Sequence, residues 1–213
     1  MMYSRGARDL PQSAEHDLGR RALFASVGGG IFIFLATVGF QGRIGLIPPI
    51  AAVVVTVLLI IGSMVALTNA DRALAANPAL ASATPRTATT RRGYILTTQF
   101  EYIGFIVVLV ICNLLGQMVW LLPLVGIISG IHYLALGRLL RSVSAWAKGA
   151  ILCVASVATV AFLPALYPAH AAPTAQVYLW WIVVGFIAGA VLWFDAIFCL
   201  AQAFRARKPA VAG

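Results

Sequence analysis

The stretch from Tyr94 to Leu136, YILTTQFEYIGFIVVLVICNLLGQMVWLLPLVGIISGIHYLAL, decides the fold. As one helix, its roughly 43 residues at 1.5 Å each would reach about 65 Å, roughly twice the thickness of a bilayer's hydrocarbon core. Gly116, Gln117 and Pro123 supply its only break of the kind that typically ends a helix. The stretch therefore predicts two membrane-spanning helices with a very tight connection at Gly116 and Gln117.

Four further apolar runs are each long enough for one span, because a bilayer core takes about 20 apolar residues in a helix. Of the 213 residues, 62% are hydrophobic and only 10% are charged, whereas a soluble domain is about 45–50% apolar and about 25% charged. The composition excludes a soluble globular protein. We predict an all-α polytopic membrane protein with six transmembrane helices in one bundle. The predicted spans are 22–40, 45–67, 94–115, 118–137, 150–166 and 177–201.

Polar segments flank and divide this transmembrane domain, which is predicted over residues 22–204. Residues 1–21 form an N-terminal segment whose following apolar run, about 19 residues long, exceeds the usual 7–15 of a signal peptide. We therefore expect the first helix to stay in the mature protein. The loop 68–93 shows no amphipathic period and is predicted to be a linker, with one short helical turn at 71–76. Residues 205–213 form a tail.

The basic residues predict the orientation in the membrane. Fourteen of the fifteen lie in segments that six alternating spans place on one side, and only Arg43 lies on the other. Because basic loops stay in the cytoplasm, both termini are predicted to be cytoplasmic, in a plasma membrane such as a bacterial inner membrane. Lys148 is counted here in the loop after the fourth span. Nucleic acid is not an expected partner, since no basic stripe interleaves with exposed aromatic side chains.

Three ionisable residues lie inside the predicted spans: Glu101, His132 and Asp195. Ionisable groups are costly in hydrocarbon and usually face a bundle interior or a wet cavity, so each is a functional-site hypothesis. Counted from the nearest arginines, all three lie about 9–15 Å inside the cytoplasmic interface, at 1.5 Å per residue. We expect at least two of them to meet, directly or through one water, in a polar pocket that faces the cytoplasm.

Helical phase adds polar neighbours to this pocket, because residues three, four and seven positions apart share a face. Gln202 shares the face of Asp195, and Tyr102 shares one with Asn113 and Gln117. The predicted ligand or ion pocket comprises Glu101, His132, Asp195, Asn113, Gln117, Tyr102, Tyr133 and Gln202. The alternatives are structural: Glu101 near the positive end of its helix dipole, and His132 or Asp195 as hydrogen-bonded packing residues.

No cofactor and no metal site are predicted. Glu101, His132 and Asp195 are weak candidates for metal ligands, because no two of them lie three or four positions apart on one helix. The three cysteines lie in apolar sequence without a C-x-x-C pair and are expected to be buried free thiols. They are Cys112, Cys153 and Cys199. No Walker A, G-x-S-x-G, H-E-x-x-H or G-x-G-x-x-G motif is present.

Two G-x-x-x-G patterns permit close approach of helices, either within the chain or at the interface of a homo-oligomer. Their glycines are Gly126, Gly130, Gly185 and Gly189. Trp180 and Trp181 lie near the outer end of the sixth span and are expected to anchor it at the lipid interface. Membrane lipids are therefore the expected partners.

The leading function hypothesis is a small multi-pass plasma-membrane protein that binds or transports a small solute, ion or lipid through the polar pocket. Protons are the expected coupling ion, because acidic side chains and histidine are the usual relay groups. One alternative is a structural or assembly protein that transports nothing. The other is an intramembrane enzyme that uses the Glu, His and Asp cluster. A wet pocket favours transport or catalysis, and a dry network of satisfied hydrogen bonds favours the structural role.

Overall fold

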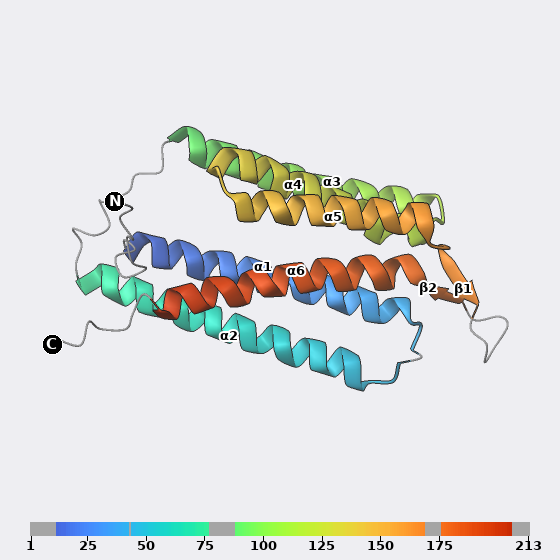
Figure 1. Ribbon diagram of the computed structural model, residues 1–213, viewed down its shortest axis with the longest axis horizontal. Coiled ribbons are helices and arrows are strands. Elements are labelled where there is room, and N and C mark those ends of the chain that lie inside the picture. Colours follow the sequence, from blue (N-terminus) through green and yellow to red (C-terminus); the bar gives the residue numbers. More distant parts are fainter. Residues whose placement is uncertain (1–11, 43, 77–87, 169–175, 206–213) are drawn as a thin grey trace, which may run out of the picture. The chain divides into compact units, whose positions relative to one another are not determined.

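A computed structural model describes residues 12–42, 44–76, 88–168 and 176–205. Within this part of the chain the structure is almost entirely helical (Figure 1). The elements are α1 (Gln12–Gly39), α2 (Ile47–Ala76), α3 (Ala88–Leu114), the 3-10 helix η2 (Met118–Trp120), α4 (Leu121–Leu140), α5 (Val143–Phe162), β1 (Leu166–Pro168), β2 (Gln176–Tyr178) and α6 (Leu179–Arg205).

Six helices are long and apolar enough to cross a membrane, which confirms the predicted fold class. The segments that meet this description are His16–Gly39, Ile47–Ala73, Arg92–Leu114, Met118–Leu140, Val143–Phe162 and Leu179–Arg205. Each has at least 20 residues, which matches the roughly 20 residues that a helix needs to cross the hydrocarbon core.

The long apolar stretch is divided where the sequence predicts. α3 ends at Leu114, and Gly116 adopts a φ of +66°. That left-handed conformation has little steric cost in glycine and reverses the chain within three residues. η2 follows, and Pro123 lies in the first turn of α4. The backbone N–H groups of a first turn have no helical acceptor, so proline, which lacks this group, loses no hydrogen bond there.

The helices extend beyond the predicted spans at their basic ends. α1 begins at Gln12 rather than near residue 22, and α2 and α3 enter the predicted linker from its two sides. The linker's central residues, 77–87, lie outside the described residues, as do 1–11 and 206–213. Hydropathy marks only the part of a helix that lies in hydrocarbon, whereas the helical hydrogen-bonding pattern continues into the polar turns beyond it.

The fifth helix begins seven residues before its predicted span, which corrects the position of Lys148. The Ser142 side chain caps α5 by accepting a hydrogen bond from the Ala145 N–H at 3.3 Å, and Arg141 takes the left-handed conformation that ends α4. A connection of two residues therefore replaces the predicted loop. Lys148 lies inside α5 and is only 6% exposed.

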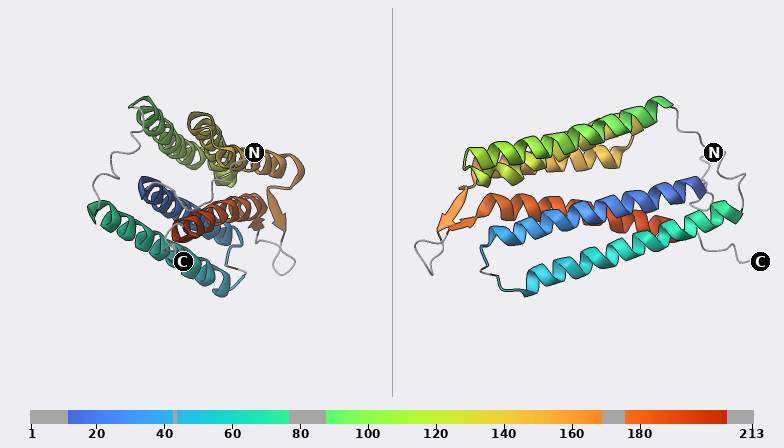
Figure 2. Two further views of the ribbon diagram at one scale, coloured as in Figure 1. Left: turned by 60° about the vertical axis from the view of Figure 1, so that its left-hand side comes forward. Right: turned by 180° about the vertical axis from the view of Figure 1, so that it is seen from behind.

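The chain divides into two compact units. Unit 1 contains Met1–Gly30, Val53–Pro85 and Leu192–Gly213, and unit 2 contains Ile31–Ala52 and Arg86–Val191. In unit 1, small residues bring α1 close to its neighbours: Gly19 lies against Leu67 of α2, and Gly28 lies against Leu192 of α6. In unit 2, α3, α4 and α5 run side by side (Figures 1 and 2).

The glycines of the G-x-x-x-G patterns pack helices of the same chain. On α4, Gly126 faces Ser156 of α5, and Gly130 faces Cys153. A Cβ on Gly185 of α6 would lie 2.7 Å from the Phe32 carbonyl oxygen of α1, and Gly189 is buried. The faces of Gly126, Gly130 and Gly185 are therefore occupied within the chain.

The two tryptophans at the start of α6 are buried within the protein. Trp180 is 6% exposed and Trp181 is 7% exposed. The Trp180 indole donates to the Leu163 carbonyl at 2.9 Å, and the Trp181 indole lies 3.1 Å from the Met118 carbonyl. The last backbone carbonyls of a helix lack helical partners, and the Trp180 indole supplies one to Leu163, at the end of α5. The connection before α6 also carries the antiparallel pair β1–β2, while residues 169–175 lie outside the described part.

Candidate functional site

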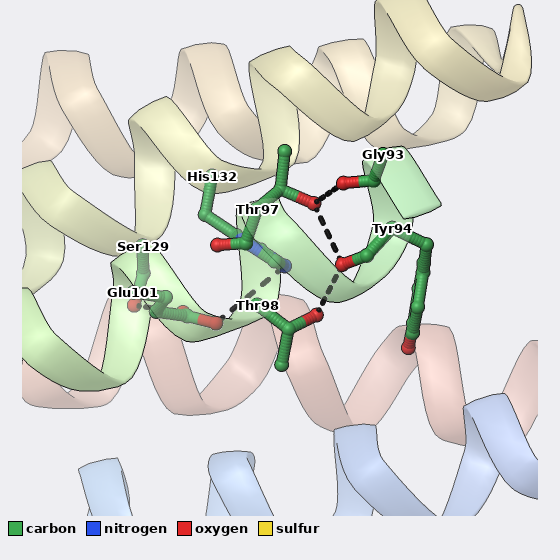
Figure 3. A network of polar contacts seen from close by, with 7 residues as sticks. All are labelled: Gly93, Tyr94, Thr97, Thr98, Glu101, Ser129 and His132. Atoms are coloured by element: carbon green, nitrogen blue, oxygen red, sulfur yellow. Dashed lines mark hydrogen bonds and ion pairs between the residues drawn. The ribbon is translucent and has the colours of Figure 1, made fainter. Parts of the chain in front are cut away.

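The candidate site lies where α3 and α4 run antiparallel in unit 2. Gly93 of α3 lies against Leu139 of α4, and Gly104 lies against Ile128. Between these contacts, the Glu101 Oε2 atom is 3.5 Å from the His132 Nε2 atom (Figure 3). The two side chains are 17% and 9% exposed. The expectation that two of the three intramembrane ionisable residues meet is confirmed for Glu101 and His132.

The contact of the second ring nitrogen of His132 indicates which ring nitrogen carries a proton. His132 Nδ1 lies 3.1 Å from the Thr97 carbonyl oxygen. A carbonyl oxygen only accepts hydrogen bonds, so Nδ1 must carry a proton and Nε2 is left to face Glu101. A proton held between Nε2 and the carboxyl group would give either a neutral acid beside an imidazole or a carboxylate beside an imidazolium.

The remaining oxygen of Glu101 also has a donor. The Ser129 hydroxyl, on a residue that is 3% exposed, donates to Glu101 Oε1 at 3.1 Å. The hydroxyls of Thr97 and Thr98 donate back to carbonyls of Gly93 and Tyr94 on their own helix (Figure 3). The pair thus sits in a polar network in which both carboxyl oxygens and both ring nitrogens have partners.

An aromatic ring links this network to a buried cation. The Tyr133 ring contacts the His132 ring edge to face, with centroids 5.5 Å apart. Lys148 of α5 places Nζ 4.9 Å from the centroid of the same tyrosine ring, a distance typical of cation–π attraction. Glutamate, histidine and lysine side chains from three helices therefore lie around one region of unit 2.

The third predicted ionisable residue, Asp195, lies in unit 1. Its Oδ1 atom accepts from the Arg21 guanidinium at 3.2 Å, with side chains 5% and 42% exposed respectively. Gln202 is partly buried on the same helix, also in unit 1. A second pair of this unit is more exposed: His16 Nε2 lies 3.4 Å from Asp71 Oδ1, with side chains 32% and 64% exposed.

The structure does not bring the other predicted pocket residues of α3 and of its connection to α4 to the Glu101 and His132 pair. Tyr102 is 55% exposed. Asn113 and Gln117 are exposed near the connection to α4, and twelve residues of helix separate Asn113 from Glu101, which is about 18 Å along the axis.

Sequence reasoning missed three contributors to this site. Ser129 lies three positions before His132 and so shares its helix face, a signal that could have found it. Lys148 could have been placed inside a helix, because Ser142 is a typical N-cap residue. Thr97 contributes its backbone carbonyl, a group that every residue has, so no residue type marks this position.

No protein-family model, curated protein or solved structure matches the chain. In the part of the chain that the structure describes, no group of three or more His, Cys, Asp or Glu side chains is arranged to hold a metal ion. The inference about function therefore depends on the geometry of the side chains themselves.

Proposed function

We propose that this membrane protein is a proton-coupled transporter of a small solute or ion, and that the Glu101 and His132 pair carries the coupling proton. The observation that carries the proposal is the 3.5 Å contact between these two side chains inside membrane-spanning segments. Ionisable groups at that depth are costly, with insertion free energies of about 2.5–3.5 kcal/mol for an aspartate at the centre of a helix. They are typical of proton relays.

The shared proton gives the pair three states. Adding a second proton yields a neutral acid beside an imidazolium, and removing the shared proton yields a carboxylate beside a neutral imidazole. Each step changes the charge of the network by one unit while the hydrogen bonds from Ser129 and to Thr97 can persist. A group that gains and loses one charge without losing its anchors is suited to proton exchange.

We place the protein in a plasma membrane with both termini in the cytoplasm. With Lys148 inside α5, thirteen basic residues still flank the spans on the proposed cytoplasmic side, against Arg43 on the other. Membrane lipids are the proposed partners of the apolar side chains that α2 and α3 expose, such as Phe100, which is 72% exposed.

The test is proton flux in proteoliposomes that contain a pH-sensitive dye. The purified protein is reconstituted, a membrane potential is imposed, and a panel of small anions, cations and neutral solutes is added in turn. We expect at least one solute to accelerate proton entry above that of empty vesicles. Glu101→Gln and His132→Gln should each lower this rate at least tenfold, because an amide keeps a hydrogen bond but does not exchange a proton at this site.

The more exposed pair His16 and Asp71 provides the matched control, since it has the same chemistry at a similar distance. The double variant H16Q/D71N should keep the wild-type rate. If wild-type vesicles respond to no solute, or if Glu101→Gln transports normally, the proposal is wrong.

A structural role is the second candidate, and the complete hydrogen bonding of the network favours it. Both side chains are largely buried and each polar atom has a partner. In that case Glu101→Gln, which can still accept from Ser129 and donate to His132, should leave the protein both stable and unchanged in flux. The same proteoliposomes therefore separate the two functions.

A further inference from the structure

One buried hydroxyl in unit 2 has no hydrogen-bond partner among the described residues. Ser156 lies on α5 and is 0% exposed, and its Oγ atom is unpartnered. It faces α4 at Gly126, where the position of an added Cβ would overlap Ser156 Oγ. A buried polar group without a partner is costly and calls for a physical explanation, commonly an ordered water.

Other fully buried serines of the helices avoid this cost. Ser26 donates to the Ala22 carbonyl at 2.7 Å, and Ser63 donates to the Leu59 carbonyl at 2.7 Å. Both bonds return to the preceding turn of the same helix. Ser156 could likewise donate to the preceding turn of its own helix, but its hydroxyl points to the neighbouring helix, toward the space that a side chain on Gly126 would fill.

The space beside Ser156 is narrow. Val184 of α6 lies 3.0 Å from the position of an added Cβ on Gly126, which closes the space on that side. Cys153 and Thr159 lie three residues before and after Ser156 on the same side of α5. Thr159 is buried, and Cys153 is partly buried and faces Gly130 of α4. Thiol and hydroxyl groups supply the polar partners that a buried water needs.

Ser156 also lies close to the Glu101 and His132 network along the helix axis. Gly126, which faces Ser156, precedes Ser129 by three residues, or about 4.5 Å of helix rise. Ser129 donates to Glu101 Oε1. The order along α4 is therefore His132, then Ser129, then the level of Ser156, running away from the Arg138 end of the helix.

We propose that Ser156 binds a water molecule between α4 and α5, and that this water relays protons to Glu101 through Ser129. In each transfer, the water gives a proton to Ser129 Oγ while Ser129 gives its own proton to Glu101 Oε1. The bound water first takes up an excess proton from bulk water, so that after the transfer it is again neutral, Ser129 is unchanged, and Glu101 has become a carboxylic acid. The relay rests on the proposed function and adds the path by which the proton reaches Glu101.

The experiment compares Ser156→Ala with Ser63→Ala in the proteoliposome assay. Ser63 is equally buried but bonds to its own helix, so it controls for the loss of a buried hydroxyl. We expect Ser156→Ala to slow proton flux at least fivefold while its thermal midpoint in detergent does not rise. Ser63→Ala should keep the wild-type rate.

Two results separate the relay from the function on which it rests. If Glu101→Gln abolishes flux but Ser156→Ala transports normally and unfolds at a higher temperature, Ser156 is an unsatisfied packing residue and the relay is wrong. If wild-type vesicles show no flux with any solute, the proposed function is wrong and the relay is wrong with it.

Discussion

At the scale of single residues, His132 joins two different contacts on α3. Its Nδ1 atom meets the Thr97 carbonyl at 3.1 Å, and its Nε2 atom meets Glu101 at 3.5 Å. Substitution can keep one contact and remove the other. An asparagine at this position would place its amide nitrogen near the position of Nδ1, and a glutamine would place its amide nitrogen near the position of Nε2. The stability of the pair can therefore be measured apart from its proton chemistry.

We predict that His132→Leu lowers the free energy of unfolding by about 1–3 kcal/mol, because it leaves one carboxyl oxygen of buried Glu101 without its partner. His132→Gln should lose about 1 kcal/mol or less, since its amide can still donate to Glu101 and interhelical hydrogen bonds in membranes average about 0.6 kcal/mol. Denaturant unfolding in detergent micelles, followed by tryptophan fluorescence, measures both. Equal stability of His132→Leu and the wild type would contradict the contact.

Part of the candidate site could be predicted from residue types. Glu101 and His132 stand out because ionisable side chains are rare in apolar runs, and the cost of isolating them predicts a partner. The partner of Asp195 could not be predicted in the same way. Arg21 lies at the edge of the apolar run and is 42% exposed, so its reach into the span depends on how α1 packs against α6.

At the scale of helices, close packing of α4 on α5 holds the site together. A Cβ on Gly130 would overlap Cys153 Sγ and would lie 2.9 Å from the Cys153 backbone nitrogen and 3.0 Å from the Gly149 carbonyl oxygen. Backbone atoms cannot move aside as the end of a flexible side chain can. The short distance between the helices therefore requires glycine at this position.

We predict that Gly130→Ala destabilises the protein by about 1–3 kcal/mol, the usual cost of overfilling a packed interior. Gly28→Ala is the matched control, because an added Cβ there meets only the end of the Leu192 side chain, at 3.2 Å. Alanine also favours a helix over glycine by about 1 kcal/mol, so Gly28→Ala should be neutral or stabilising. Thermal unfolding in one detergent compares the two, and a neutral Gly130→Ala would show that α4 and α5 can separate without cost.

Helix number followed from the sequence more reliably than helix ends did. The division at Gly116 was predictable because no single helix of that length fits a bilayer, and the +66° φ of Gly116 supplies the break. The start of α5 was not predictable from hydropathy, since residues 143–149 include Ser144 and Lys148. The buried Lys148 places its Nζ atom 4.9 Å from the centroid of the Tyr133 ring, a contact that depends on tertiary packing.

At the scale of the whole molecule, the distribution of arginines along the chain predicts its orientation. Arg92 lies near the start of α3, Arg138 near the end of α4, and Arg205 at the end of α6. If successive spans alternate in direction, these three positions are predicted to share one side of the membrane. The positive-inside rule then predicts that this side is the cytoplasm.

We predict that single cysteines introduced in a variant without native cysteines report this orientation. Ser144→Cys, at the exposed start of α5, should react with a membrane-impermeant maleimide only after the cytoplasmic face is opened. Gln41→Cys and Gln117→Cys are exposed at the opposite ends of α1 and α3 and should react in intact cells. If Ser144→Cys reacts from outside, the predicted orientation is reversed. The Glu101 and His132 pair would then lie in the outer half of the membrane, because each side chain is only nine residues from an arginine, Glu101 from Arg92 and His132 from Arg141. Coupled protons would in that case reach the site from outside first.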